Sequence, residues 1–126
     1  MKFKNKALRI ACDGGAASGK SLAAKLVGQK YGLYILNSGI FYRYASFLII
    51  KHKPKKITSF LKKKFKNINS KNIFKLDLHA QEISEHVVNL AKQKKVRNII
   101  RTFQKKLIKK YPRIVVEGRD TASSIM

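Results

Sequence analysis

One loop constrains the fold of this chain more than any other feature. Residues 14–21 read Gly-Gly-Ala-Ala-Ser-Gly-Lys-Ser and fit the pattern G-x-x-x-x-G-K-[ST]. Its glycines allow several backbone N–H groups to turn toward one anion, because they tolerate unusual dihedral angles and carry no Cβ. Lys20 adds a positive charge for the β and γ phosphates of a nucleotide, and the hydroxyl of Ser21 is a ligand for Mg²⁺. The sequence therefore predicts a nucleotide-phosphate site with Ser21 on the metal.

The residues on both sides of the loop predict a strand before it and a helix after it. Leu8, Ile10 and Cys12 have the spacing of a buried strand, and Gly32 is placed to end the helix. A phosphate-binding loop requires this order, so a glycine-rich turn that binds nothing is the weaker alternative. We expect the helix to bury Leu22, Ala23, Leu26 and Val27.

Length and charge limit the class of protein. The 126 residues suffice for one domain and are few for a complete doubly wound nucleotide kinase. The formal charge of +23 comes mostly from lysine, and the chain is also rich in Ile and Asn, as AT-rich coding produces. We therefore explain the positive charge by compositional bias together with attraction for phosphorylated small molecules. A nucleic-acid partner is possible but not favoured. The single cysteine excludes an internal disulfide. No stretch of 18 apolar residues is present, so we expect a cytoplasmic protein without a membrane partner. We also expect a monomer.

Two further buried strands are predicted, and each is followed by polar residues. Residues 33–36 lead into Asn37, and residues 114–116 lead into Glu117. In open parallel sheets, ligands bind beyond the carboxyl ends of the strands. We therefore expect residues 37–43 and 117–120 to lie on the ligand side of the sheet, with residues 37–43 facing the phosphate-binding loop.

The region between these strands is mostly helical in pattern. We expect a helix near residues 40–49 that ends before Pro54, a lysine-rich helix from about Thr58 or Ser59, and a long helical region from Glu82 to about Lys110 with a break near Lys94. Phe74, Leu76 and Leu78 alternate with polar residues and predict a half-buried strand. The expected inward residues of the helices are Ile40, Phe41, Tyr44, Ala45, Leu48, Ile49, Val87, Leu90, Ala91, Val96, Ile99, Ile100, Phe103 and Leu107.

The ordered motifs of the chain resemble those of bacterial cytidylate kinase, which phosphorylates CMP and dCMP. The resemblance rests on residues 13–21, on Asn37-Ser38-Gly39-x-x-Tyr42-Arg43, on Val96-Arg97 in a helix, and on Glu117-Gly118-Arg119-Asp120 after a strand. It implies an α/β P-loop nucleoside monophosphate kinase fold, a parallel sheet with flanking helices. Residues 1–126 would form one domain, with an inserted monophosphate-binding region at about 51–95.

The resemblance also implies a reaction, the transfer of the γ-phosphoryl group of ATP to CMP or dCMP. Positioning and charge neutralisation carry such a transfer, and an ionised phosphate acceptor needs no general base. Lys20, Arg43 and Arg119 would stabilise the transferring group. The implied ATP and Mg²⁺ site consists of Gly14, Gly15, Ala16, Ala17, Ser18, Gly19, Lys20, Ser21 and Leu22, with Ser21 on the metal.

The same resemblance assigns residues to the monophosphate. Arg43 and Arg119 would hold its phosphate, because a guanidinium fork matches phosphate oxygens in pairs. Arg97 and Asp120 would lie near the cytosine, and Ser38 and Tyr42 near the monophosphate. The alternatives are a surface ion pair for each arginine and, for Asp120, the orientation of Arg119 or Arg43.

Several positions depart from the family pattern. Gly15 stands where the family usually has Pro, and Ala17 where it has Gly. Leu22 replaces a small or hydroxyl residue, and Asn37 replaces Asp. Val88 stands where a serine that contacts the base is typical, and Ser84 is the substitute one helical turn away.

The chain ends six residues after Asp120, whereas the family continues with two more strands and an arginine-bearing lid. We therefore expect an incomplete fold whose last strands and lid are missing, and whose third strand lacks a neighbour. The alternative to an active kinase is a catalytically incompetent remnant that binds nucleotide or nucleic acid.

Overall fold

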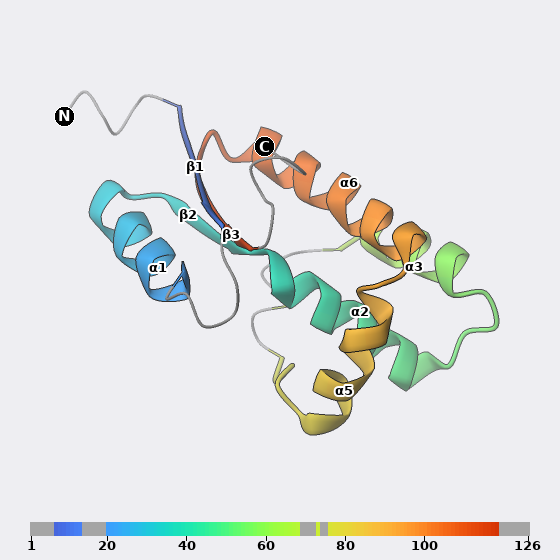
Figure 1. The fold of residues 1–126 in the computed structure, drawn as a ribbon. Helices are drawn as coiled ribbons and strands as arrows, with labels where there is room; N and C mark the ends of the chain where they lie inside the picture. Colours follow the sequence, from blue (N-terminus) through green and yellow to red (C-terminus); the bar gives the residue numbers. More distant parts are fainter. Residues whose placement is uncertain (1–6, 14–19, 69–72, 74–75, 119–126) are drawn as a thin grey trace. The chain divides into compact units, whose positions relative to one another are not determined.

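The protein contains a parallel sheet and several α-helices, as a computed structural model shows (Figure 1). The structure describes residues 7–13, 20–68, 73 and 76–118. They divide between two compact units, the sheet unit (residues 1–38 and 104–126) and the helical unit (residues 39–103). The elements in chain order are β1 (Leu8–Asp13), α1 (Lys20–Tyr31), β2 (Tyr34–Asn37), α2 (Ser38–His52), α3 (Ile57–Lys66), α5 (Gln81–Leu90), α6 (Lys94–Lys110) and β3 (Arg113–Gly118).

The strand β3 is the centre of the sheet. The strand order is β1-β3-β2, and both neighbours pair with β3 in parallel. Ile114, Val115 and Val116 are fully buried, as expected of a strand covered on both faces. All three strands predicted around the phosphate-binding loop are confirmed. The expectation that the third strand lacks a neighbour is wrong, because the edge strands of the described sheet are β1 and β2.

The helix α1 packs against the sheet through small residues. Ala24 is fully buried in a cluster with Leu33 and Val115. Gly28 lies one turn further along, where a Cβ would overlap the side chain of Ile35. Residues without bulk at this spacing allow the helix to lie close to the strands.

The outward face of α1 carries the larger apolar residues. Leu22 is 63% exposed and Leu26 is 56% exposed, and Ala23 is exposed as well, while Val27 is partly buried. The prediction that Leu22, Ala23 and Leu26 face inward is therefore wrong. Periodicity alone favoured the leucines, but the close approach at Gly28 turns the Ala24 side toward the sheet.

The end of α1 follows the predicted glycine cap. Gly32 has φ +63°, and the N–H of Leu33 donates to the carbonyl of Gly28 at 2.8 Å. This bond spans the last turn of the helix and belongs to a Schellman cap. The chain can then enter β2 directly.

The opposite face of the sheet is also covered. Leu36, Ile114 and Val116 are fully buried, and alternation along β3 places the last two on the side away from Val115. Figure 1 shows the C-terminal part of α6 on the side of the strands opposite α1. The buried residues Leu107 and Ile108 come from that part, and Tyr34 stacks on Tyr111 with 4.1 Å between ring centroids.

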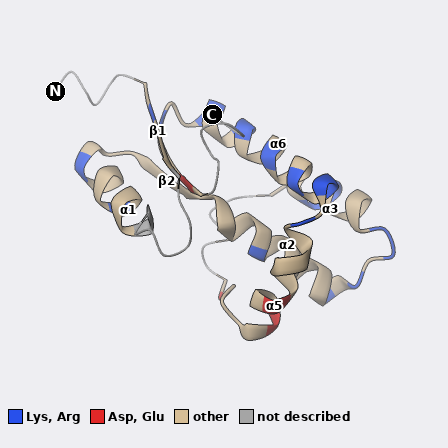
Figure 2. Cartoon of the chain, in the orientation of Figure 1, with Lys and Arg blue, Asp and Glu red and all other residues tan. Residues whose placement is uncertain are grey.

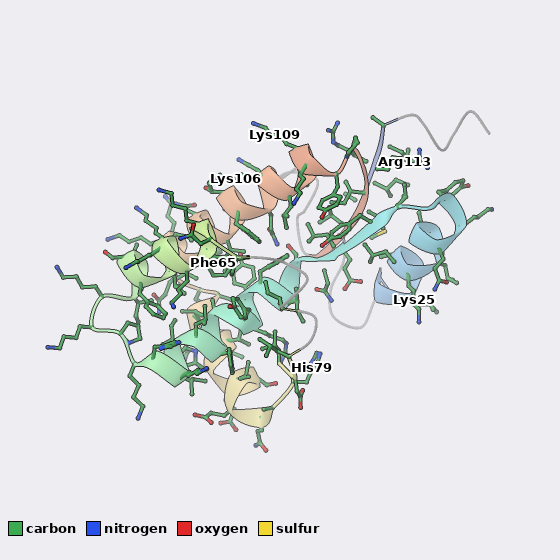
Figure 3. The ribbon with its side chains drawn as sticks, turned by 180° about the vertical axis from the view of Figure 1, so that it is seen from behind. Lys25, Phe65, His79, Lys106, Lys109 and Arg113 are labelled. Carbon is green, nitrogen blue, oxygen red and sulfur yellow. The ribbon has the colours of Figure 1, made fainter. Side chains whose placement is uncertain are left out.

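The helical unit has an aromatic core. Phe41 and Phe65 each meet Phe103 edge to face, with centroids 5.2 Å and 5.4 Å apart, and Tyr44 packs edge to face on Phe65. Figure 3 shows Phe65 pointing from α3 into the helical unit. The helix predicted at 40–49 is confirmed and extended, because α2 begins at Ser38 and ends two residues before Pro54.

The long helical region near the C-terminus is broken where the sequence predicted. Ala91 to Gln93 separate α5 from α6. The N–H groups of Lys92 and Gln93 donate to carbonyls three residues earlier, which tightens the chain into a turn. Most of the predicted inward residues are buried, Val96, Ile99, Ile100 and Phe103 among them.

The half-buried strand predicted at 74–78 is not formed by its described residues. Leu76 to Leu78 belong to no strand, and Phe74 lies outside the described residues. Leu78 is fully buried whereas Leu76 is 39% exposed, although a strand would place both on one face. The carboxylate of Asp77 accepts the N–H of His79 at 3.1 Å, a local turn that replaces pairing with another strand.

Candidate functional site

The carboxyl ends of the three strands meet at one edge of the sheet. In the parallel register Asp13 lies opposite Gly118, and Asn37 lies opposite Glu117. The last residues of β1, β2 and β3 therefore lie side by side, at the edge where open α/β sheets bind ligands. The strand β3 extends further than predicted, since Glu117 and Gly118 are its last residues, and Glu117 is buried in it.

The predicted phosphate-binding loop follows β1 in the sequence. Residues 14–19 lie outside the described residues, while Lys20 is the first residue of α1 and Ser21 the second. The N-terminal end of α1, which carries partial positive charge, thus lies where the loop ends. Leu22, also assigned to the nucleotide site, lies in the first turn and is exposed.

Ser38 is held at the end of β2 by a buried glutamine. The side-chain amide of Gln104 donates to the Ser38 hydroxyl oxygen at 2.8 Å and to its carbonyl at 3.4 Å. Gln104 is 1% exposed and belongs, like Ser38, to the sheet unit. A hydroxyl oxygen that accepts this bond can still donate its own proton.

Arg43 reaches from α2 to the start of α5. Its Nη1 atom donates to the hydroxyl of Ser84 at 2.8 Å and to the carbonyl of Leu78 at 3.1 Å. Ser84 thus lies beside the arginine predicted to hold a phosphate. Val88, at the position expected to contact the base, is apolar and 56% exposed.

Tyr42 lies close to two arginines of α6. Burial raises the pKa of its phenol above the ordinary value of 10, and the positive charges of Arg101 and Arg97 oppose this shift. The phenol is therefore protonated at neutral pH and can donate a hydrogen bond to an anion. The structure brings together Tyr42 and Arg97, both assigned to the monophosphate from the sequence.

Arg97 also ties α6 to the end of α5. Its Nη1 atom donates to the carbonyl of Lys92 at 3.0 Å and to that of Ala91 at 3.4 Å. Carbonyls at a helix C-terminus carry partial negative charge and favour a guanidinium. The two arginines therefore contact opposite ends of the α5 region, Arg43 at its start and Arg97 at its end.

Two other predicted site residues, Arg119 and Asp120, lie outside the described residues. In the sequence they follow directly after Gly118, the last residue of β3. Their assignment to the phosphate and the base stays a prediction.

Sequence reasoning missed two polar residues. Arg101 lies one helical turn after Arg97, and this spacing of four residues places both on one face of α6. Gln104 interrupts an otherwise apolar stripe between Ile100 and Leu107, the signal of a buried polar group with a partner. Both signals were present in the sequence.

Basic residues recur along α6, as Figure 2 shows. Lys106 and Lys109 project away from the strands in Figure 3, and both are exposed. Acidic residues are few, and Glu82 and Glu85 lie together on α5. Within the described ranges, no helix has the length and apolar character needed to cross a membrane.

The strand, loop and helix order and the parallel register define an α/β fold of the P-loop nucleoside monophosphate kinase class. The sequence model of one family, cytidylate kinase, matches residues 10–126. The chain belongs to the cytidylate kinase family.

Curated relatives agree with this assignment. The cytidylate kinase of Aquifex aeolicus (strain VF5) is 30% identical over 131 residues, which is 94% of this chain. Those of Mesomycoplasma hyopneumoniae (strain 7448) and Clostridioides difficile (strain 630) are each 30% identical, over 100% and 94% of this chain. The chain spans 59% of the length of each of these three relatives.

Proposed function

We propose that this protein is a nucleoside monophosphate kinase that transfers the γ-phosphoryl group of ATP to CMP or dCMP. The observation that carries the proposal is the match to the cytidylate kinase family over residues 10–126. The protein would act on these small molecules as a cytoplasmic monomer. The alternative of an incompetent remnant that binds nucleotide or nucleic acid is not favoured, because the family match points to a kinase and exposed lysines need no partner other than water.

In the proposed mechanism, the sheet unit binds ATP. The glycine-rich loop and the N-terminal end of α1 suit a polyanion, and Lys20 supplies a mobile charge for the β and γ phosphates. The hydroxyl oxygen of Ser21 would be a ligand for Mg²⁺ beside the triphosphate, since Mg²⁺ prefers oxygen ligands. When bound, Mg²⁺ would neutralise charge on the phosphates.

The helical unit, which contains the predicted insertion at 51–95, would contribute several of the residues that bind the monophosphate. Arg43 and the protonated phenol of Tyr42 provide donors for its phosphate, and Arg97 and Arg101 add positive charge beside Tyr42. We propose that Arg119 joins Arg43 on the phosphate, that Asp120 and Arg97 contact the cytosine, and that Ser38 lies near the monophosphate. The protein would then act by holding two ionised groups close together in a positive environment.

A coupled assay of ADP formation tests this proposal. With ATP and Mg²⁺ we expect turnover on CMP and dCMP that exceeds turnover on AMP. Lys20→Ala should lower the rate by about 10³-fold, because one charge on the transferring group contributes several kcal/mol. Lys25→Ala, an exposed lysine of the same helix, is the matched control and should leave the rate unchanged. Equal rates for Lys20→Ala and the wild type would contradict the proposal.

A further inference from the structure

The guanidinium of Arg43 is fixed by two acceptors that come from one short segment. The Ser84 hydroxyl and the Leu78 carbonyl lie 2.8 Å and 3.1 Å from the same atom, Nη1. They are separated from Arg43 by 41 and 35 residues in sequence. Contacts of this range hold a side chain in place only where the fold supports the acceptors.

The acceptors are themselves firmly held. Leu78 is fully buried, so its backbone carbonyl lies beside a side chain anchored in the helical unit. Ser84 lies in the first turn and a half of α5, next to Ile83, which is 6% exposed. The N–H of Ser84 donates to the carbonyl of Ala80 at 3.0 Å, which fixes its backbone as well. A site residue supported in this way loses little freedom when a ligand binds.

The choice of nitrogen leaves a defined part of the guanidinium for a ligand. An arginine side chain has five N–H donors, two of them on Nη1. Both hydrogen bonds of Arg43 to described residues come from Nη1, so the edge formed by Nη2 and Nε keeps its donors. That edge presents two parallel N–H groups, the geometry that binds two oxygens of one phosphate.

We propose that Ser84 is a positioning residue for the substrate phosphate. Together with the Leu78 carbonyl, it turns the Nη2 and Nε edge of Arg43 toward the monophosphate. This inference rests on the proposed function, which makes Arg43 a phosphate ligand. It places Ser84 on the phosphate side of the site. The sequence had suggested a different role for Ser84, a contact to the base in place of Val88.

Nucleotide binding to single variants tests the role of Ser84. Dissociation constants for CMP and UMP are measured by calorimetry on the full chain, with the wild type, Ser84→Ala and Ser84→Thr. We expect Ser84→Ala to weaken both nucleotides about fivefold, the effect of one hydrogen bond, and to leave their ratio unchanged. Ser84→Thr keeps the hydroxyl and should restore affinity to within about twofold of the wild type. Ser59→Ala removes an exposed hydroxyl from α3 and is the matched control.

Coupling to Arg43 separates positioning from a direct contact. In the Arg43→Lys background, Ser84→Ala should have no further effect, because the group it positions is gone. Nitrogen-detected NMR of the guanidinium gives a second readout, in which rotation about the Arg43 Nε–Cζ bond is slow in the wild type and faster in Ser84→Ala.

The outcomes are distinct. A change in the ratio of CMP to UMP affinity would overturn the proposal in favour of a base contact. If Ser84→Ala changes neither the affinity for the nucleotides nor the rotation of Arg43, the role of Ser84 is wrong, while the proposed function still stands. A wild-type chain that binds no nucleoside monophosphate would contradict the proposed function as well.

Discussion

The two units of the molecule arrange their candidate residues in different ways. In the sheet unit, backbone pairing positions the residues, because the parallel register brings Asp13, Asn37 and Gly118 to one edge. In the helical unit, side-chain hydrogen bonds position them, since Arg43 donates to Ser84 and Arg97 donates to two carbonyls. A site built on backbone follows from the fold, whereas a site built on side chains depends on single residues.

This difference predicts which substitutions each unit tolerates. The sheet unit should lose its site only when its core is damaged or when the loop itself changes. The helical unit should lose affinity through a single polar substitution that leaves its stability almost intact.

The largest effect is expected in the core of the sheet unit. Leu36→Ala should lower the free energy of unfolding by about 2–5 kcal/mol, because Leu36 is fully buried in β2. Leu26→Ala, on the exposed face of α1, should change it by about 0.5 kcal/mol or less. Urea unfolding measures both. Comparable losses would show that the leucine face of α1 is buried after all.

The next effect separates the two nucleotides. Arg43→Ala should weaken CMP binding by about 100-fold, the contribution of a charged hydrogen-bonded pair, and leave ATP binding within about twofold. Lys20→Ala should do the reverse. Calorimetry with each nucleotide and both variants gives four values. If each variant weakened both nucleotides equally, the assignment of Lys20 to ATP and of Arg43 to CMP would be wrong.

A smaller effect is expected at the buried pair in the sheet unit. Gln104→Leu removes the amide that donates to Ser38 and should cost about 1–2 kcal/mol of stability. Adding Ser38→Ala should recover part of this loss, because both polar partners are then replaced by apolar groups. Lys105→Leu, at an exposed neighbouring position, is the control in thermal unfolding. Independent, additive losses would contradict the pairing.

The smallest effect concerns pH. The pKa of Tyr42 is raised above 10 in the folded protein, so the unfolded chain releases this proton first as pH rises. Stability from Tyr42 is therefore complete below pH 10 and falls above it. Tyr42→Phe should match the wild type from pH 7 to 9 and lose less stability above pH 10. Absorbance at 295 nm follows the ionisation, and an ionisation of Tyr42 below pH 10 would contradict the burial effect.

Much of the backbone could be predicted from the sequence, for physical reasons that the two helices α1 and α6 illustrate. The apolar stripe of α6 is regular, and Ile99, Ile100 and Phe103 are buried as its period requires. The helix α1 has two apolar faces, and the face with the small residues Ala24 and Gly28 packs on the sheet because it allows closer contact. The spacing of apolar residues alone does not distinguish the two faces.

The candidate site could be predicted in part from motifs along the chain. The loop at residues 14–21 announces its place between β1 and α1, and Arg43 and Arg97 were named from ordered motifs. The partners of these arginines were not predictable, because Ser84 and Leu78 meet Arg43 only through the packing of α5. Tertiary contacts of 35 residues or more leave no local pattern in the sequence.

The proposed mechanism depends on two separate sets of contacts, with ATP bound at the start of α1 and the monophosphate bound by residues that include Arg43 of the helical unit. Amide NMR spectra of the full chain, titrated with ATP and with CMP in turn, test it most directly. We expect ATP to shift signals at the start of α1, and CMP to shift signals of Tyr42, Arg43, Ser84 and Arg97. Shifts confined to one unit for both nucleotides would contradict it.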